Sequence, residues 1–190
     1  MAIATKIVSL AELLDGGFSK SGIRKAFSRF KCERDPDVSL FLKAHAIQNE
    51  GTGASRTYLA LSSDALDEDR LEVVAFVTIA VTVTDYTDID LGRRLQIMGR
   101  VPGVQTSNFF PGYLVAQLAR DDRYTHEDFD ASELLPFAEE MIADAISVVG
   151  GRFAYIDCHD ELVSYYERQD YESLFYDGSR GLHKLIKPLF

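Results

Sequence analysis

Long apolar segments are missing from this sequence. No run approaches the roughly 18 consecutive apolar residues that indicate a membrane-spanning helix. The first residues, MAIATKIVSLAELL, also lack the charged start and the continuous apolar block of a secretory signal peptide. These absences predict a cytoplasmic protein that does not associate with a membrane.

Cysteine is scarce too. The two cysteines, Cys32 and Cys158, are far apart in the sequence and fit no metal-ligand spacing, and no grouping of His, Cys and Asp residues does so. We therefore expect two reduced structural thiols and no metal site.

Positive charge is also in short supply. The 20 Lys and Arg residues are outnumbered by 30 Asp and Glu residues, which gives a formal net charge of -10. Because phosphate contacts need Lys and Arg, this balance argues against general nucleic-acid binding. One segment is nevertheless basic and contains Lys20, Arg24, Lys25, Arg29, Lys31 and Arg34. Its expected role is the solvated face of a helix, and a docking patch for a polyanion is the alternative.

What is present is the composition of one globular domain. The chain has 190 residues and is 46% hydrophobic, which is enough for a single core. We therefore expect one domain over residues 1–190. The alternative is that residues 1–35 form an N-terminal appendage to this domain.

The spacing of apolar residues predicts the secondary structure. Helical periodicity favours helices over 21–30, 36–47, 88–100, 134–149 and 160–171. Alternating or continuous apolar runs favour strands over 55–63, 71–85, 112–121, 152–159, 172–178 and 183–190. Residues 7–14 suit a short strand or a helical turn, and DALDEDR suits a polar hairpin turn. This order predicts an α+β fold built on one mixed sheet.

Three segments, in this order, resemble the GNAT family of acyl-CoA-dependent N-acetyltransferases. LARDDRY (118–124) resembles the end of the family's fourth strand, L-A-V-D-P-x-Y, and RFAYIDCH (152–159) fits its fifth strand. YYERQDY (165–171) resembles the family's F-Y-x-x-x-G-F. The segment FLKAHAIQNEGTGASRTYLAL is similar to toxin-like and phage-encoded members, and GGRFAYIDCHDELVSYYERQDY is closer to the phage-like branch.

The resemblance implies a mostly antiparallel mixed sheet flanked by helices, in which two parallel central strands, 112–120 and 152–159, splay apart at their C-terminal ends. It also implies acetyl-CoA as cofactor. By resemblance, the backbone of Leu118, Ala119 and Arg120 would hold the pantetheine arm and polarise the thioester carbonyl.

The resemblance also assigns side-chain roles. Tyr166 matches the family tyrosine that protonates the leaving thiolate, and a tyrosine pKa of about 10 is close to that of a thiol. Its neighbour Tyr165 is expected to be a core residue. No general base is obvious, although Asp157 and Asp160 remain candidates. Arg56 is expected to anchor the helix before it, with substrate contact as the alternative.

The loop before the helix at 134–149 departs from the family pattern. The family's pyrophosphate motif, Q/R-x-x-G-x-G/A, places His126 at the Gln or Arg position, Phe129 at the first glycine and Ala131 at the last position, so that only Ala131 matches. Backbone N–H groups near Ser132 could still meet a phosphate. The acidic loop makes weak binding of acetyl-CoA the expectation. Because Pro136 cannot donate a helix hydrogen bond, the helix is expected to begin at Ser132 or to kink.

These observations favour an N-acetyltransferase that moves an acetyl group to the amine of a small molecule or a protein, with a degenerate pyrophosphate loop. One alternative is an inactive GNAT-fold binding or assembly module. The other is a toxin-like enzyme that acetylates an aminoacyl-tRNA and pairs with a DNA-binding antitoxin. No nucleic acid other than such a tRNA is expected as a partner, and a homodimer is left open.

Overall fold

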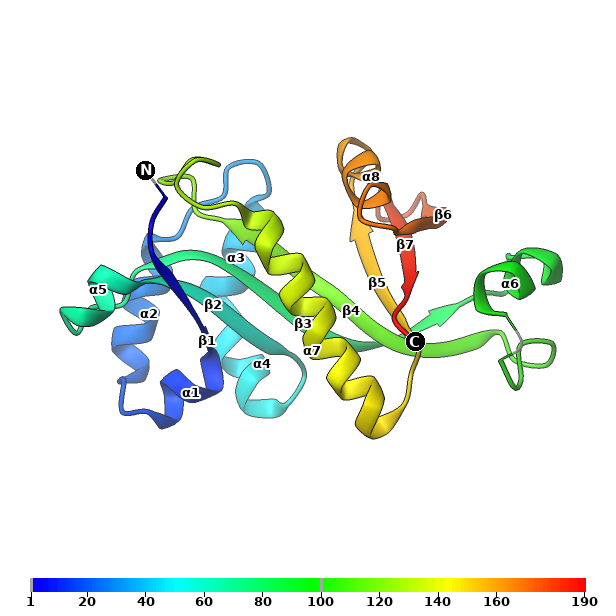
Figure 1. The fold of residues 1–190 in the computed structure, drawn as a ribbon, viewed down its shortest axis with the longest axis horizontal. Coiled ribbons are helices and arrows are strands. Elements are labelled where there is room, and N and C mark those ends of the chain that lie inside the picture. The colour runs from blue at the N-terminus through cyan, green and yellow to red at the C-terminus, as the bar shows by residue number, and fades with distance from the viewer. Residues whose placement is uncertain (1, 100) are drawn as a thin grey trace. The chain divides into compact units, whose positions relative to one another are not determined.

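The computed structural model describes residues 2–99 and 101–190 (Figure 1). Their seven strands form one sheet in the order β1-β2-β3-β4-β5-β7-β6. The strands are β1 (Thr5–Ser9), β2 (Arg56–Ser62), β3 (Val73–Asp85), β4 (Phe109–Arg120), β5 (Phe153–Cys158), β6 (Glu172–Asp177) and β7 (Leu182–Pro188). The helices are α1 (Leu10–Asp15), α2 (Lys20–Arg29), α3 (Pro36–Ala44), α4 (Ala46–Thr52), α5 (Ser63–Asp67), α6 (Leu91–Met98), α7 (Leu134–Val149) and α8 (Asp160–Glu167).

The mixed sheet with flanking helices confirms the predicted α+β fold class. The two strands predicted to be neighbours, β4 and β5, are adjacent in the sheet order. Their divergence at the C-terminal ends stays a prediction. None of the described helices is long and apolar enough to cross a membrane.

The chain forms two compact units, and β3, β4 and α7 each contribute residues to both. Unit 1 contains the described residues of 1–80 and 115–140, and unit 2 contains those of 81–114 and 141–190. The assignment of one GNAT-like domain over residues 1–190 stays a prediction.

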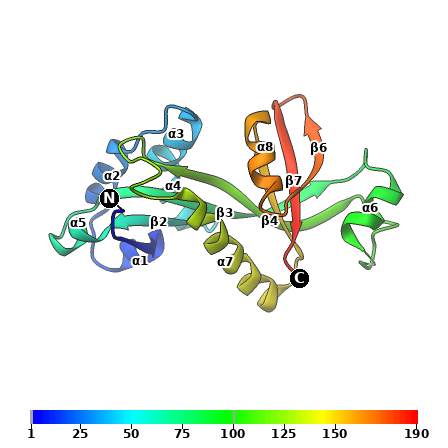
Figure 2. The same ribbon diagram turned by 45° about the horizontal axis from the view of Figure 1, so that its top comes forward.

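Unit 1 holds the N-terminal half of the sheet, in which β2 pairs antiparallel with both β1 and β3 (Figure 2). Residues 7–14, predicted as a strand or a helical turn, contain both. Strand β1 ends at Ser9, whose hydroxyl accepts the N–H of Glu12 (3.1 Å) while the Glu12 carboxylate accepts the N–H of Ser9 (2.9 Å). This reciprocal cap starts α1 at Leu10. Core residues of unit 1 come from α1 to α4, β2, β3 and β4.

Two local predictions in unit 1 need correction. The single helix predicted over 36–47 is two helices, α3 and α4, because the chain leaves helical geometry at His45 (φ -116°). The second helix ends at Gly53 in the left-handed region (φ 73°), the stop expected from the glycines there. The predicted hairpin turn after β2 contains the short helix α5, whose cap is Ser62.

Unit 2 holds β5, β6 and β7, with β7 paired antiparallel to the other two. Its core includes a buried tyrosine pair, Tyr86 and Tyr155, with hydroxyls 3.0 Å apart. Gly112 of β4 lies so close to β5 that an added Cβ would be 2.4 Å from the Tyr155 ring. Only glycine fits at this point of the strand. Helix α6 lies within the predicted 88–100, and Arg100 of that prediction is outside the described residues.

Candidate active site

The end of β4, predicted to hold the pantetheine arm, belongs to unit 1. Ala119 is buried, while Leu118 and Arg120 are half-buried. The Arg120 guanidinium donates to the Phe129 carbonyl (2.8 Å), so this side chain braces the following loop. Next to them, the Gln117 side-chain oxygen is buried and has no hydrogen-bond partner among residues 2–99 and 101–190. Such an orphaned acceptor is uncommon in a folded protein and suits a ligand N–H donor.

Asp121 fixes the point where β4 becomes the loop. Its carboxylate is fully buried and forms a two-pronged ion pair with Arg123, through Nε (3.0 Å) and a terminal nitrogen (3.0 Å). The same carboxylate accepts the Lys31 N–H (3.3 Å), and the Asp121 N–H donates to the Val74 carbonyl (2.8 Å). Asp121 therefore ties the strand end to β3 and to the segment after α2. Its place in the LARDDRY motif was the sequence signal for this residue.

Tyr124, the last residue of that motif, also has a structural partner. Its hydroxyl donates to Glu72 just before β3 (2.6 Å). Burial, followed by the hydrogen bond to the Glu72 carboxylate, raises the pKa of Tyr124. The phenol therefore stays protonated and works as a clamp between two chain segments.

The loop itself uses its own N–H donors. The Ser132 N–H donates to Asp130 Oδ1 (2.9 Å), the Glu133 N–H to the Asp130 carbonyl (3.1 Å), and the Leu134 N–H to the Ala131 carbonyl. The expectation that N–H groups near Ser132 are free for a phosphate is therefore wrong for these three. They are consumed because residues 131–133 form a 3-10 turn capped by Asp130.

This turn also changes the predicted start of the helix. Asp130 is the cap, and α7 begins at Leu134 rather than at Ser132. Pro136 then lies in the first turn of α7, where its missing N–H has no intrahelical partner to lose. The prediction of a start at Ser132 is therefore wrong, because the sequence did not show that a 3-10 turn capped by Asp130 precedes the helix.

Loop side chains depart from the family pattern in two different ways. Phe129, at the position of the first motif glycine, is buried, so its ring is turned away from solvent. His126 is exposed, with Nε2 3.3 Å from Asp130 Oδ2. The N–H of Ser132 and its side chain lower the pKa of Asp130 by hydrogen bonding to the carboxylate. The loop is therefore anionic at the position where the family binds a diphosphate.

Tyr166 lies in unit 2, at the C-terminal end of α8. It is buried, and its ring makes edge-on contacts with Tyr165 (centroids 5.0 Å apart) and Tyr171 (6.1 Å). Tyr165 is only half-buried, so the prediction that Tyr165 is the core residue of the pair is wrong. The packing of α8 against β6 and β7 decides which face is buried, and helical spacing alone did not reveal it.

Asp170 gives the clearest structural counterpart of the family motif. The motif F-Y-x-x-x-G-F has glycine at this position, and Asp170 has φ 65°, in the left-handed region. The N–H of Tyr171 then donates back to the Tyr166 carbonyl (3.1 Å). Aspartate is one of the few non-glycine residues that adopt this conformation readily. The backbone shape that the glycine would provide is thus present without the glycine.

The candidate bases are engaged in ion pairs within unit 2. Asp157 contacts Arg180 (2.8 Å) and Lys184 (2.6 Å), and Asp160 contacts His183 (2.5 Å). Each of the two carboxylate oxygens of Asp157 is therefore occupied by a cation of unit 2. Sequence periodicity contains no signal for these distant partners, which come from the turn between β6 and β7 and from β7 itself.

Other sequence predictions concern residues outside the motifs. Arg56 donates to the Glu50 carbonyl (2.9 Å) and to its carboxylate (2.7 Å), which confirms that it anchors the preceding helix α4. Both cysteines are free. Burial raises the pKa of the Cys158 thiol to about 11, so the thiol stays protonated at neutral pH. The described residues contain no group of three or more His, Cys, Asp or Glu able to hold a metal.

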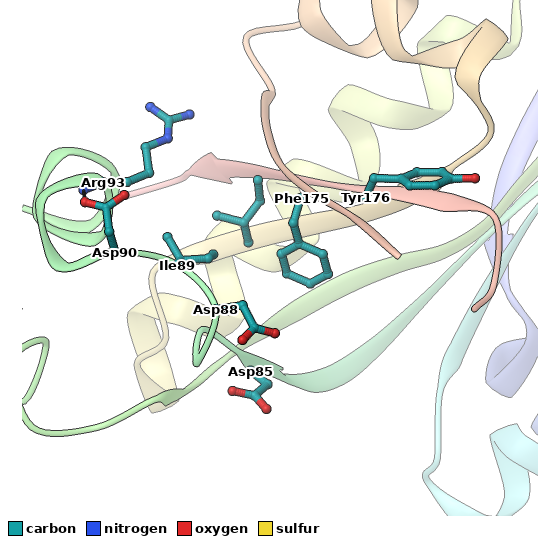
Figure 3. Close-up of a pocket in the computed structure, with 8 residues that line it drawn as sticks. Asp85, Asp88, Ile89, Asp90, Arg93, Phe175 and Tyr176 are labelled. Atoms are coloured by element: carbon teal, nitrogen blue, oxygen red, sulfur yellow. Dashed lines mark hydrogen bonds between the residues drawn. The ribbon is translucent and has the colours of Figure 1, made fainter. Parts of the chain in front are cut away.

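Unit 2 also contains a pocket of about 340 Å³ between α6 and β6. Figure 3 shows Asp85 and Asp88 on one side, with the Phe175 ring directed toward Asp88 and the Tyr176 ring directed away. Two of its groups have local roles, because Asp90 caps α6 through the Arg93 N–H (3.0 Å) and Arg93 pairs with Glu172 (3.2 Å). These contacts account for the Asp90 and Arg93 side chains of the lining.

The sequence matches no protein-family model and no curated protein. Among solved structures, the chain is similar to AtaT complexed with acetyl-methionyl-tRNAfMet, with a TM-score of 0.72 and 16% identity over 97% of this chain and 95% of that one. It is similar to a tyrosine-to-phenylalanine mutant of KacT, with a TM-score of 0.71 and 13% identity over 97% and 95%. An AtaT mutant toxin bound to the C-terminus of the antitoxin AtaR and acetyl-CoA gives 0.68 and 13% over 97% and 93%. The chain has the GNAT fold.

Proposed function

We propose that this protein is an acetyl-CoA-dependent N-acetyltransferase. The observation that carries the proposal is the match between the C-terminal end of α8 and a GNAT motif, in a chain that has the GNAT fold. There Tyr166 matches the family's acid in the sequence motif, and Asp170 has the left-handed backbone that the motif glycine would adopt. Solved structures of the same fold include AtaTR bound with acetyl-CoA, at 16% identity and a TM-score of 0.66.

Acetyl transfer requires one proton to leave the amine and one proton to reach the departing sulfur. Acetyl-CoA supplies a thioester, and transfer forms a C–N bond while the C–S bond breaks. The amine loses a proton, and Tyr166 donates one to the departing sulfur before it is reprotonated from solvent. With Asp157 held by two cations, a neutral amine drawn from solution, rather than deprotonation by this carboxylate, suits the reaction.

The residues that would hold the pantetheine arm are the β4 positions Leu118, Ala119 and Arg120. Gln117 supports this assignment, since its buried oxygen lacks a partner among the described residues and matches an amide N–H donor. At the loop, His126, Ala131 and Ser132 are the positions assigned to the diphosphate. Because Ser132 already donates its N–H to Asp130, weak binding of the diphosphate is the expected result.

The internally bonded loop also favours a second candidate, a GNAT-fold binding module without catalysis. A third, a toxin-like acetyltransferase, takes its support from the neighbours. AtaT has been solved with acetyl-methionyl-tRNAfMet and with the antitoxin AtaR. For this chain, an aminoacyl-tRNA amine as acceptor, an antitoxin as partner and a cytoplasmic location are parts of that candidate.

Calorimetric titration of acetyl-CoA into the purified protein separates these candidates. We expect a Kd between about 10 μM and 1 mM, which corresponds to roughly 4–7 kcal/mol. Acetylation of a panel of amines, followed by mass spectrometry, then distinguishes the enzyme from the binding module. Absence of both binding and acetylation would reject the acetyltransferase, and sub-micromolar binding would reject the weakened loop.

A further inference from the structure

The most concentrated positive charge of the molecule lies on one face of unit 1. The basic face consists of Lys20, Arg24, Lys25 and Arg29 on α2, with Lys31 and Arg34 in the segment that follows. All six side chains are exposed, and none forms an ion pair within the part of the chain that the structure describes. Glu33 is the one acidic residue among residues 20–34. The segment is thus strongly basic in a chain whose net charge is -10.

The basic face does not stabilise its own helix. Lys20 and Arg24, and likewise Lys25 and Arg29, are like-charged pairs four residues apart, each unfavourable by roughly 0.2–0.5 kcal/mol. Lys20 also lies at the N-terminus of α2, where a cation opposes the helix dipole and no acidic residue compensates it. Charges that weaken the helix and pair with nothing in the described protein suit an external anion.

The segment after α2 is held rigidly against the end of β4. The Lys31 N–H donates to the buried Asp121 carboxylate (3.3 Å), and the Asp122 N–H donates to the Lys31 carbonyl (2.9 Å). The Glu33 N–H donates to the Asp122 carboxylate (2.7 Å). These bonds fix the backbone that carries Lys31 and Arg34 beside the strand end that leads into the candidate loop.

We infer that the basic face binds the phosphate backbone of an RNA. Three of its six cations are arginines, whose guanidinium groups bind phosphate oxygens in pairs. The two aromatic residues of the segment, Phe27 and Phe30, are buried and unable to stack on bases, so the contacts are to phosphate and independent of sequence.

A membrane surface fits this face less well. Helices that lie on a membrane insert apolar side chains between the lipids. In α2 the apolar residues Ile23, Ala26 and Phe27 are turned into the core of unit 1 and are at most 6% exposed. The exposed side offers charge without an apolar anchor.

The choice of RNA rests on the toxin-like candidate of the proposed function, in which an aminoacylated RNA carries the amine that the reaction needs. The basic face would hold that RNA beside the end of β4. It uses residues other than Tyr166 and the acetyl-CoA positions, so the two proposals can fail independently.

Fluorescence anisotropy with a labelled, unacylated transcript of tRNA size tests this inference. The triple variant Arg24→Gln, Lys25→Gln and Arg29→Gln removes three cations with a residue of similar helix propensity. The matched control Lys6→Gln, Lys43→Gln and Arg70→Gln removes three exposed cations elsewhere in unit 1. The two triple variants therefore have the same net charge. Thermal unfolding checks that both remain folded.

We expect the triple variant to bind at least about tenfold more weakly at 50 mM salt, and the slope of log K against log salt to become shallower by about 2. The control should bind like the wild type. Equal losses in both variants, or no loss in either, would overturn the inference. Binding to phosphatidylserine vesicles without RNA binding would overturn the inference and assign the basic face to a membrane surface. RNA binding without acetyl-CoA binding would keep this inference and reject the proposed enzyme.

Discussion

The loop after β4 and the C-terminal end of α8 both resemble GNAT motifs, yet they depart from the family in different ways. In the loop, only Ala131 of the three motif positions 126, 129 and 131 matches the family pattern. The N–H groups of the next three residues, 132–134, are hydrogen-bonded within the turn. At α8 a motif glycine is also replaced, but Asp170 keeps its left-handed backbone. A substitution that preserves backbone conformation leaves a motif intact, whereas one that consumes the ligand-binding donors changes what the motif can bind.

The conformation of the loop after β4 depends on Asp121, and removing the Asp121 side chain has the largest expected effect on stability. In Asp121→Ala, the Arg123 guanidinium and the Lys31 N–H lose a fully buried acceptor. Loss of one partner of a buried pair typically costs about 3–5 kcal/mol, and we expect roughly 3 kcal/mol because Arg123 is partly exposed. Urea unfolding measures this loss.

The control for Asp121 is its neighbour. Asp122 is exposed and accepts a single N–H from Glu33, so Asp122→Ala should lose only about 1 kcal/mol. Similar losses in the two variants would show that Asp121 does not organise the junction.

The α8 half of the comparison depends on Tyr166. If Tyr166 is the general acid, Tyr166→Phe removes the donated proton and should lower kcat by roughly 10²-fold or more. The free energy of unfolding should change little, since the ring contacts with Tyr165 and Tyr171 remain. The matched control Tyr165→Phe should keep its activity. Discontinuous acetylation assays measure kcat of both variants. Full activity in Tyr166→Phe would show that another group donates the proton to the thiolate.

A smaller effect is expected from the charge of the loop. Asp130→Asn keeps a side-chain oxygen that can accept the Ser132 N–H but removes one negative charge beside the proposed diphosphate position. Acetyl-CoA binding should tighten by up to about 1 kcal/mol, and the gain should shrink as salt screens the charge. Calorimetry at two salt concentrations measures it, and an unchanged Kd would mean that the diphosphate does not approach Asp130.

The control for this charge effect is Asp130→Ala, which removes both charge and cap. It should lose about 1 kcal/mol of stability. Replacing Phe129 by glycine, attractive from the motif alone, is not a useful variant. Because the ring is buried, its removal would leave a cavity that costs about 3–5 kcal/mol.

Sequence reasoning succeeded where structure is determined locally. The order of strands and helices and the anchoring of α4 by Arg56 follow from periodicity or from neighbouring residues. The break at His45 and the short helix α5 were missed because each depends on one cap or one dihedral angle.

Contacts between distant segments could not be predicted. The pairing of Asp157 with Arg180 and Lys184 depends on the register of β5 against β7. The burial of Tyr166 rather than Tyr165 depends on what α8 packs against. Neither leaves a periodic signal in the sequence.

The smallest effect tests the backbone equivalence directly. A left-handed conformation is unfavourable for most L-residues by roughly 1–2 kcal/mol, less for aspartate, and glycine is free of it. Glycine also gains more freedom on unfolding, by roughly 0.5–1 kcal/mol, so Asp170→Gly should be more stable by at most about 0.5 kcal/mol. Asp170→Ala should be less stable by about 1 kcal/mol, since alanine lacks the local hydrogen bonds that help aspartate at φ 65°. Urea unfolding measures both, and Asp69→Gly at φ 56° provides a matched test in unit 1. If alanine were as stable as glycine at position 170, the left-handed turn and with it the equivalence to the family motif would be lost.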